Sequence, residues 1–131
     1  MAQRGYRVHA VDWSLAALGR PAIEASRQDL ALDFLVADLT RHPLPVERYD
    51  VVLCFRYLER SLWPDMERAL RPGGALLMET FTEAHRRDHP EFPAAYCLAP
   101  EELRRAFPLL KIALYHESRR QGTASLLALR P

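Results

Sequence analysis

Short apolar, β-rich runs recur along this chain at intervals, and they are the feature that most constrains its fold. The runs are nearly continuous in apolar residues, which is typical of strands covered on both faces and therefore of a parallel sheet. The last two runs are separated by only five residues, so they predict an antiparallel hairpin at the edge of that sheet. The runs cover residues 6–11, 33–36, 49–55, 75–81, 111–117 and 123–129.

Helix signals lie between these runs. Ser14 is a suitable N-cap for a helix over residues 15–18, which resumes at 22–30 after a glycine and a proline. Residues 65–70 predict a second helix that stops at an Arg-Pro-Gly-Gly turn. Pro100 and the two glutamates after it predict the start of a last helix. The alternation of strands and helices predicts the α/β class.

Length and charge exclude several classes of protein. The 131 residues suit a single domain, and 18 Lys+Arg against 17 Asp+Glu give a net charge of +1. A general nucleic-acid binder usually carries a basic excess, so we expect no nucleic-acid partner. No apolar run approaches the 18 residues of a membrane span, and we expect no membrane partner or signal peptide. Cys54 and Cys97 form no metal-binding or disulfide pattern, which favours a reducing cytoplasm.

Two acids stand at the ends of predicted strands, where ligands bind in doubly wound sheets. Asp12 is placed to accept both hydroxyls of a ribose, and the ring of Trp13 to stack on adenine; alternatively, Asp12 caps the next helix. Asp38 is placed to accept the adenine amine while Leu39 packs on the ring; alternatively, it only starts a loop.

These positions fall in segments that resemble a known family. Residues 5–14, 36–39 and 49–55 look like the second, third and fourth motifs of class I S-adenosylmethionine-dependent methyltransferases, and 70–77 like the turn and strand that follow. Residues 55–60 with 79–82 resemble a bacterial subgroup near the tellurite-resistance-type methyltransferases. The resemblance implies a Rossmann-like sheet of strand order 3-2-1-4-5-7-6, S-adenosylmethionine as cofactor and a small-molecule substrate.

The chain also departs from that family. Its glycine-rich first motif lies about 20 residues before the ribose acid, whereas Asp12 has 11 residues before it, with Gly5 as their only glycine. The expected domain, residues 1–131, is therefore truncated and lacks the first, central strand. We expect one of three outcomes: the neighbouring strands pair directly across the gap, a second chain fills it, or the chain is unstable. Of these we favour a homodimer that completes the sheet. A coding start upstream of Met1 is the remaining alternative.

The resemblance implies roles for the residues that follow the strand at 49–55. Phe55 would contact the cofactor, and Arg56 would hold an anionic substrate unless it is only a solvated loop charge. Tyr57 would lie near the sulfonium through cation–π attraction, and Glu59 is the nearest candidate base. Methyl transfer itself needs mainly an aligned nucleophile, because the sulfonium is already activated.

The segment 82–99 has two prolines and no clear period, which is typical of a functional lid or a mobile loop. His85 and His89 stand at helical spacing, but no third ligand of clear spacing follows, so we expect a solvated polar loop and no metal site. Elsewhere, Cys54 is expected to pack in a buried strand, and Glu79 to mark a strand end near the site or a helix cap. Other candidates in the segment are Asp88 and Glu91 beside the histidines, and Arg86, Arg87 and Tyr96 as substrate contacts.

The sequence thus predicts a cytoplasmic methyltransferase-like protein that uses S-adenosylmethionine on an unknown small molecule. Loss of the glycine-rich loop supports a second hypothesis, a non-catalytic domain derived from a methyltransferase that self-associates or binds a partner. The third hypothesis is that this chain is a fragment of an ordinary enzyme.

Overall fold

The computed structural model describes residues 7–12, 32–36 and 39–131. The chain divides into two compact units, Met1–His42 and Pro43–Pro131. Each unit contains its own sheet, and the two are described separately below.

The sheet of the first unit has two parallel strands, β1 (Val8–Asp12) and β2 (Leu32–Val36). Their register pairs Val8 with Leu32 and Asp12 with Val36, so the two strands end at the same edge. The strands predicted at 6–11 and 33–36 are confirmed to within two residues. The helices predicted at 15–18 and 22–30 lie outside the described residues.

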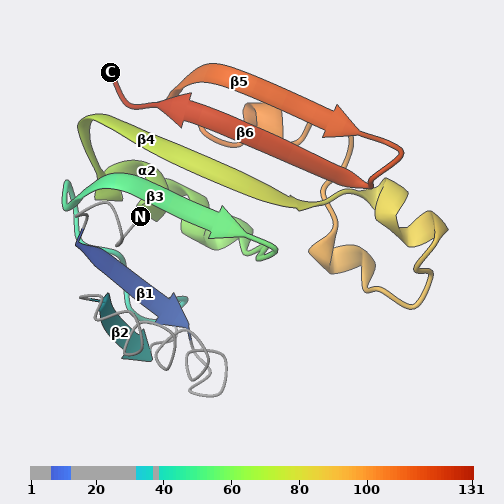
Figure 1. Cartoon of the computed structure of the whole chain (residues 1–131), viewed down its shortest axis with the longest axis horizontal. Coiled ribbons are helices and arrows are strands. Elements are labelled where there is room, and N and C mark those ends of the chain that lie inside the picture. Colours follow the sequence, from blue (N-terminus) through green and yellow to red (C-terminus); the bar gives the residue numbers. More distant parts are fainter. Residues whose placement is uncertain (1–6, 13–31, 37–38) are drawn as a thin grey trace. The chain divides into compact units, whose positions relative to one another are not determined.

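The second unit has a four-stranded mixed sheet in the order β3-β4-β6-β5 (Figure 1). β3 and β4 run parallel, and β6 runs antiparallel to both β4 and β5, so the predicted terminal hairpin is confirmed. This order is the 4-5-7-6 part of the order that the family resemblance implies. The strands are β3 (Tyr49–Phe55), β4 (Leu70–Phe81), β5 (Lys111–Ser118) and β6 (Thr123–Leu129).

The connection from β3 to β4 contains the helix α2 (Trp63–Ala69), where residues 65–70 were predicted to be helical. Its first turn contains Pro64, whose missing N–H costs nothing there. The Arg-Pro-Gly-Gly turn lies in a bulge of β4, and Gly73 adopts a φ of 81° that favours glycine. The backbone N–H of Gly73 donates to the Arg130 carbonyl (2.8 Å), which ties this bulge to the end of the chain.

The hydrophobic core lies on one face of the four-stranded sheet. α2 contacts β3 and β4 there, and the 3₁₀ helix η5 (Leu103–Arg105) contacts β6. Full burial of each large apolar side chain contributes roughly 1.5–3 kcal/mol. Trp63 of α2 packs on Phe107 with 5.6 Å between the ring centroids. Side chains that are less than 2% exposed include Leu70, Leu76, Met78, Leu98 and Leu103.

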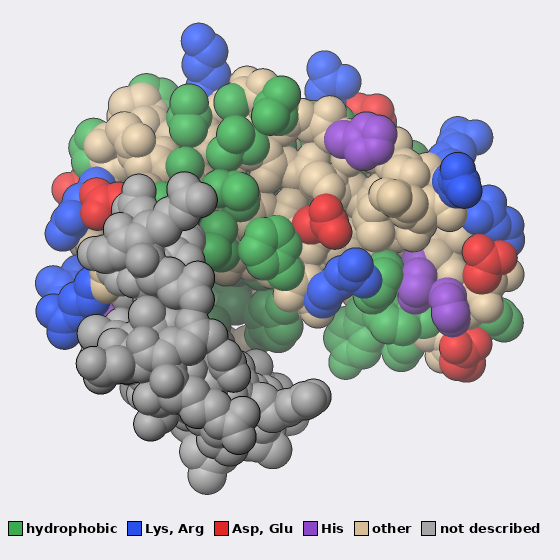
Figure 2. Space-filling view, viewed as in Figure 1, with side chains coloured by type: hydrophobic (Ala, Val, Ile, Leu, Met, Phe, Trp, Pro, Cys, Tyr) green, Lys and Arg blue, Asp and Glu red, His purple; other side chains and the backbone are tan. Residues whose placement is uncertain are grey.

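The opposite face of this sheet is much less buried. Leu53 and Phe55 of β3 are 46% and 54% exposed, and Leu114 of β5 is 68% exposed. In Figure 2, hydrophobic side chains gather on the face turned away from α2. The apolar strand pattern predicted burial on both faces, whereas in residues 43–131 only one face is covered.

The last predicted helix is wrong. Beyond Pro100 there are turns and the three residues of η5, because Glu101 takes a left-handed φ of 61° and Pro108 follows soon after. The segment 82–99 has no strand of its own and contains the 3₁₀ helices η3 (Glu83–Arg87) and η4 (Ala94–Tyr96). Among the described residues no helix is long and apolar enough to cross a membrane.

Candidate functional site

A pocket of about 500 Å³ lies in the second unit, where β3 and β4 end and β6 begins. Ligands of open α/β sheets bind beyond the carboxyl ends of parallel strands, so the location is that of a functional site. We call it the Arg56 pocket. Its lining residues are Arg56, Glu79, Phe81, His85, His89, Gln121 and Thr123.

Arg56 follows β3 directly and has a backbone φ of 58°, which is uncommon for a residue other than glycine. Its backbone N–H donates to the Glu79 carbonyl at 2.8 Å, which holds the turn against β4. The guanidinium carbon lies 4.4 Å from the centroid of the Phe81 ring. The predicted substrate-binding residue is therefore a fixed part of the pocket, although its side chain remains 55% exposed.

Glu79 is the acidic member of the pocket. One of its carboxylate oxygens accepts a hydrogen bond from the Ser125 hydroxyl of β6 at 2.6 Å. The other lies 3.8 Å from the Arg56 guanidinium. The sequence predicted either a strand end near the site or a helix cap; Glu79 lies in β4, two residues before the strand ends, and its nearness to a functional site stays a prediction.

His85 and His89 lie on the same side of the segment 82–99 and stack on each other, with 4.5 Å between centroids. His85 also stacks on Phe81 at 3.8 Å with 19° between the ring planes. The backbone at Gly122 approaches so closely that a Cβ there would lie 2.6 Å from the His85 Cα. In Figure 2 two histidine side chains lie together, with basic and acidic side chains near them.

The environment of His85 favours the neutral imidazole. Partial burial lowers its pKa first, and the positive charges of His89 and Arg56 lower it further, whereas Glu91 and Asp88 act in the opposite direction. His89 Nδ1 lies 3.6 Å from the Glu91 carboxylate. Among the described residues, no three His, Cys, Asp or Glu side chains form a group suited to a metal ion.

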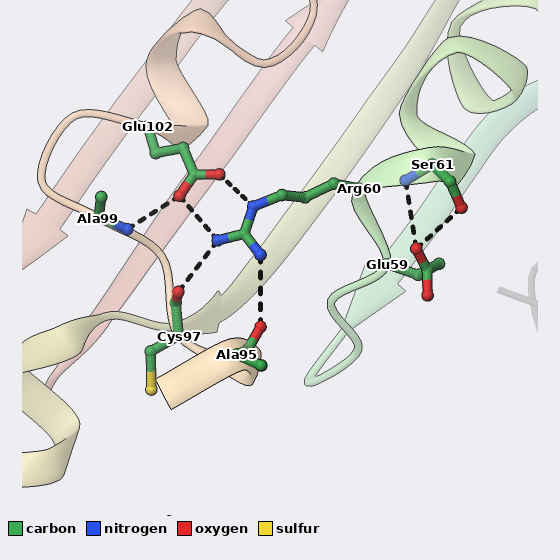
Figure 3. Close-up of polar contacts among 7 residues, drawn as sticks. All are labelled: Glu59, Arg60, Ser61, Ala95, Cys97, Ala99 and Glu102. Atoms are coloured by element: carbon green, nitrogen blue, oxygen red, sulfur yellow. Dashed lines mark hydrogen bonds and ion pairs between the residues drawn. The ribbon is translucent and has the colours of Figure 1, made fainter. Parts of the chain in front are cut away.

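A bidentate ion pair holds the segment that borders the site (Figure 3). The Arg60 guanidinium donates to both Glu102 carboxylate oxygens at 2.5 and 2.9 Å, and to the carbonyls of Ala95 and Cys97 at 3.3 and 3.1 Å. Glu102 also accepts from the Ala99 backbone N–H at 2.9 Å. The hydrogen bond from Arg60 lowers the pKa of Glu102 below its usual value.

The other predicted acceptor-site residues do not line this pocket. The Glu59 carboxylate caps the 3₁₀ helix η2 (Arg60–Leu62) by accepting from the Ser61 backbone and hydroxyl (3.3 and 2.8 Å). Tyr57 is 43% and Tyr96 56% exposed. The guanidiniums of Arg86 and Arg87 donate to backbone carbonyls of Phe92 and Arg119.

The predicted cofactor residues are only partly described. Asp12 is the last residue of β1, Leu39 is half-buried, and Phe55 ends β3 with its ring 54% exposed. Trp13 and Asp38 lie outside the described residues. A carboxylate at the carboxyl end of a parallel strand suits the hydroxyls of a ribose, so the position of Asp12 fits the cofactor that the resemblance implies.

Cys54 is confirmed as a packing residue. Burial raises the pKa of its thiol to about 11, and the sulfur has only a weak contact with the Tyr57 carbonyl, at 3.5 Å. Such a thiol is a poor nucleophile at neutral pH.

Sequence reasoning missed three residues of the Arg56 pocket, namely Phe81, Gln121 and Thr123. Phe81 ends a predicted strand, and its position beside the carboxyl end of a parallel strand was a usable signal. Gln121 and Thr123 lie at the hairpin turn, and only the pairing of β6 with β4 brings them to the site.

Comparison with known proteins places this geometry in a family. A model described as "Methyltransferase domain" matches residues 1–78 of the chain. A search of curated proteins returned no match. The solved structure of TehB from Haemophilus influenzae is 15% identical with a TM-score of 0.81, and the match covers 99% of this chain and 52% of that one.

Two methyltransferase structures with bound ligands are similar as well. NodS from Bradyrhizobium japonicum WM9, an N-methyltransferase in complex with S-adenosyl-L-homocysteine, is 19% identical with a TM-score of 0.72, over 95% of this chain and 67% of that one. A geranyl diphosphate methyltransferase in complex with S-adenosylmethionine is 17% identical with a TM-score of 0.75, over 98% and 71%. The chain thus spans 52–71% of the length of these three structures. Identities this low show the fold alone, whereas the family model covers more than half of the chain. The chain belongs to the class I S-adenosylmethionine-dependent methyltransferase domain family.

Proposed function

We propose that this protein is an S-adenosylmethionine-dependent methyltransferase that acts on a small molecule. The observation that carries the proposal is the Arg56 pocket, which lies at the carboxyl ends of two parallel strands in a chain of this family. Its volume of about 500 Å³ falls within the range of small-molecule sites.

In the first unit, the Asp12 carboxylate would accept the ribose hydroxyls and Asp38 the adenine amine, while Trp13 and Leu39 would contact the adenine faces. The family resemblance separately implies a cofactor contact for Phe55, the last residue of β3. When bound, the cofactor would supply an electrophilic methyl group, with S-adenosylhomocysteine as the leaving group. The chain's own residues have the task of orienting the acceptor, which accounts for much of the rate in such reactions.

Arg56 and His85 are the residues placed to do this. Arg56 offers a fixed positive charge, and the neutral imidazole of His85 offers a nitrogen that accepts a proton from the acceptor. Tyr57, near the sulfonium, and Glu59, as a base, are further candidates, and the Glu59 carboxylate is engaged at its helix cap.

Calorimetric titration with S-adenosylhomocysteine tests the proposal. We expect saturable binding to the wild type and a loss of at least tenfold in affinity for Asp12→Asn. Asp50→Asn removes a carboxylate that is 73% exposed and pairs only with Arg71 in the described part of the chain, so it serves as the matched control. Absence of heat and of any thermal shift at millimolar ligand would rule the proposal out.

A second candidate function, a methyltransferase-derived domain that self-associates, is favoured by the open face of the four-stranded sheet. The strand register places Leu53 beside Leu77, Leu77 beside Leu127, and Leu127 beside Leu114, so an apolar row crosses all four strands. β3 is also the edge strand of this sheet among the described strands. We propose a homodimer in which a second copy completes the sheet at β3 and covers this row.

Sedimentation velocity over a hundredfold range of protein concentration tests the homodimer. We expect a concentration-dependent shift from monomer to dimer, abolished by Leu53→Glu and unchanged by Leu109→Glu. Leu109 is 66% exposed and lies outside the strands, so it controls for the added charge. A monomer at every concentration contradicts the homodimer and leaves the methyltransferase proposal intact.

We also propose a cytoplasmic location. Cys54 and Cys97 are both free and buried, and thiols kept in that state are typical of a reducing compartment. Fractionation of cells that produce the tagged full chain tests this assignment.

A further inference from the structure

The positive charge in the Arg56 pocket is only partly compensated. The Glu79 carboxylate lies 3.8 Å from the guanidinium, which is too long for a hydrogen bond, and its other oxygen is occupied by Ser125. Within the described part of the chain, no hydrogen bond from the Arg56 side chain is formed. A guanidinium has five N–H donors in a planar fork that matches a carboxylate, so Arg56 retains donors for an anionic group of a ligand.

The backbone of Arg56 is held in a left-handed conformation that is strained for a residue with a Cβ. The hydrogen bond to the Glu79 carbonyl and the contact of the guanidinium with the Phe81 ring maintain this conformation. Backbone strain of this kind clusters at ligand-binding sites, where it contributes to preorganisation.

The other main surface of the pocket is made of flat rings. Phe81, His85 and His89 stack successively with centroid separations of 3.8 and 4.5 Å and interplanar angles of 19° and 23°. Phe92 meets both Phe81 and His85 edge-on, at 5.2 and 5.0 Å, and so supports the stack. Phe81 and His89 occupy the faces of His85, whereas the His89 side chain is 54% exposed, so a planar aromatic ligand can stack on His89 at the end of the row.

The remaining charges define where an acid group fits. The basic side chains near His85 are those of Arg56 and His89. The acidic side chains near it are those of Glu91, Asp88 and Glu79. Because His85 is favoured in its neutral form, Arg56 is the pocket's permanent cation at neutral pH. Glu79 repels an anion from its own side, so an acid group is directed to the guanidinium edge away from Glu79.

We propose that the Arg56 pocket takes an aromatic acid as methyl acceptor, with the acid group paired to Arg56 and the ring against the exposed His89 imidazole at the end of the stack. This substrate class rests on the proposed methyltransferase function. A pocket of about 500 Å³ has room for a single-ring acid.

A titration of the full chain with 4-hydroxybenzoate, followed by NMR of the histidine imidazoles, tests the substrate class. We expect saturable shifts of the His85 and His89 resonances and no shift of His116, which lies on β5. Phenol lacks the acid group and cyclohexanecarboxylate lacks the aromatic ring, so each should bind at least tenfold more weakly. Equal binding of phenol, or no shift up to the solubility limit, overturns the proposal.

Variants provide a second, independent arm of the test. Arg56→Gln should weaken 4-hydroxybenzoate at least tenfold, and Arg56→Lys should lie between it and the wild type because the charge remains without the planar fork. Arg104→Gln makes the same change of net charge outside the pocket lining and should alter affinity less than twofold. An unchanged affinity in Arg56→Gln, with a native circular dichroism spectrum, overturns the proposal.

Failure of the proposed substrate class can be distinguished from failure of the proposed methyltransferase function. Binding of S-adenosylhomocysteine without binding of 4-hydroxybenzoate overturns the substrate class alone. Binding of 4-hydroxybenzoate without binding of S-adenosylhomocysteine supports the acid site and contradicts the methyltransferase proposal.

Discussion

Arg60 and Glu102, which are 42 residues apart in the sequence, form a bidentate ion pair that joins η2 to the turn before η5. The same guanidinium holds the carbonyls of Ala95 and Cys97, and the same carboxylate holds the Ala99 backbone (Figure 3). The Arg60–Glu102 pair therefore holds the backbone of residues 95–99 in place.

Removal of this pair should destabilise the protein more than removal of a surface pair. We expect a double-mutant cycle of Arg60→Gln and Glu102→Gln, measured by urea unfolding, to give a coupling free energy of about 1 kcal/mol, since partial exposure screens the charges. The exposed pair Arg104–Glu101 is the control and should give below about 0.5 kcal/mol. Equal coupling in the two cycles contradicts the structural role of Arg60.

The ion pair also predicts an acid-dependent loss of stability. The hydrogen bond from Arg60 holds the pKa of Glu102 below its usual value of about 4.5, so the folded state releases this proton more readily than the unfolded state. The resulting stabilisation is complete above pH 4.5 and is lost as the pH falls through the lowered pKa. Unfolding curves between pH 3 and 6 should show a smaller decline for Glu102→Gln than for the wild type, and parallel declines would refute the assignment.

For Glu67 we expect the opposite dependence of stability on pH. Its side chain on α2 is 4% exposed and accepts a weak, 3.5 Å hydrogen bond from the Leu109 backbone, and burial raises its pKa above the usual value of about 4.5. The charged form is thus disfavoured in the folded state, and wild-type stability falls as the pH rises above 4.5 through the raised pKa.

Glu67→Gln should therefore stabilise the protein at pH 7 by about 1 kcal/mol, since an amide is less costly to bury than a charge. The advantage should disappear below pH 4.5, where the wild-type carboxyl is protonated in both states. Thermal unfolding at pH 4 and 7 measures the difference, with the exposed Glu91→Gln as control. A loss of stability at pH 7 contradicts this interpretation.

Two glycines with positive φ should respond differently to alanine. A Cβ at Gly122 would lie 2.6–2.9 Å from the backbone and Cβ of His85, whereas a Cβ at Gly73 meets nothing within 4 Å. Both variants carry the strain of a left-handed alanine, of roughly 1 kcal/mol, and only Gly122→Ala should add a clash. We expect Gly122→Ala to cost at least about 1 kcal/mol more in urea unfolding and to shift the His85 imidazole resonances. Equal costs would show that the turn does not press on His85.

The thiols should be inert in the native protein. Burial raises the pKa of Cys54 to about 11 and also raises that of Cys97, so the thiolate fraction near pH 7.5 is very small. Ellman's reagent should label both cysteines within seconds in guanidinium chloride and label the folded chain at least a hundredfold more slowly. Rapid labelling of the native state contradicts the burial of these side chains.

The strands could be predicted from the sequence because their signals are local. The apolar run at 49–55 matches β3 at both ends, and the run at 123–129 matches β6, since period and β-propensity are read from adjacent residues. The predicted helix after Pro100 failed for the same reason: its local signals were outweighed by the left-handed Glu101 and by the bonds of Glu102 to Arg60 and Ala99.

The α/β class, the terminal hairpin and the family follow from the sequence, because strand patterns and motif spacing depend on neighbouring residues. Which of the candidate side chains meet depends on the tertiary structure. The sequence predicts a ligand-binding role for Arg56 and a solvated loop for His85, but only the parallel pairing of β3 with β4 and the turn at Gly122 bring them to one pocket. Such contacts join residues far apart in the chain, and their geometry follows from packing against the sheet rather than from any local pattern.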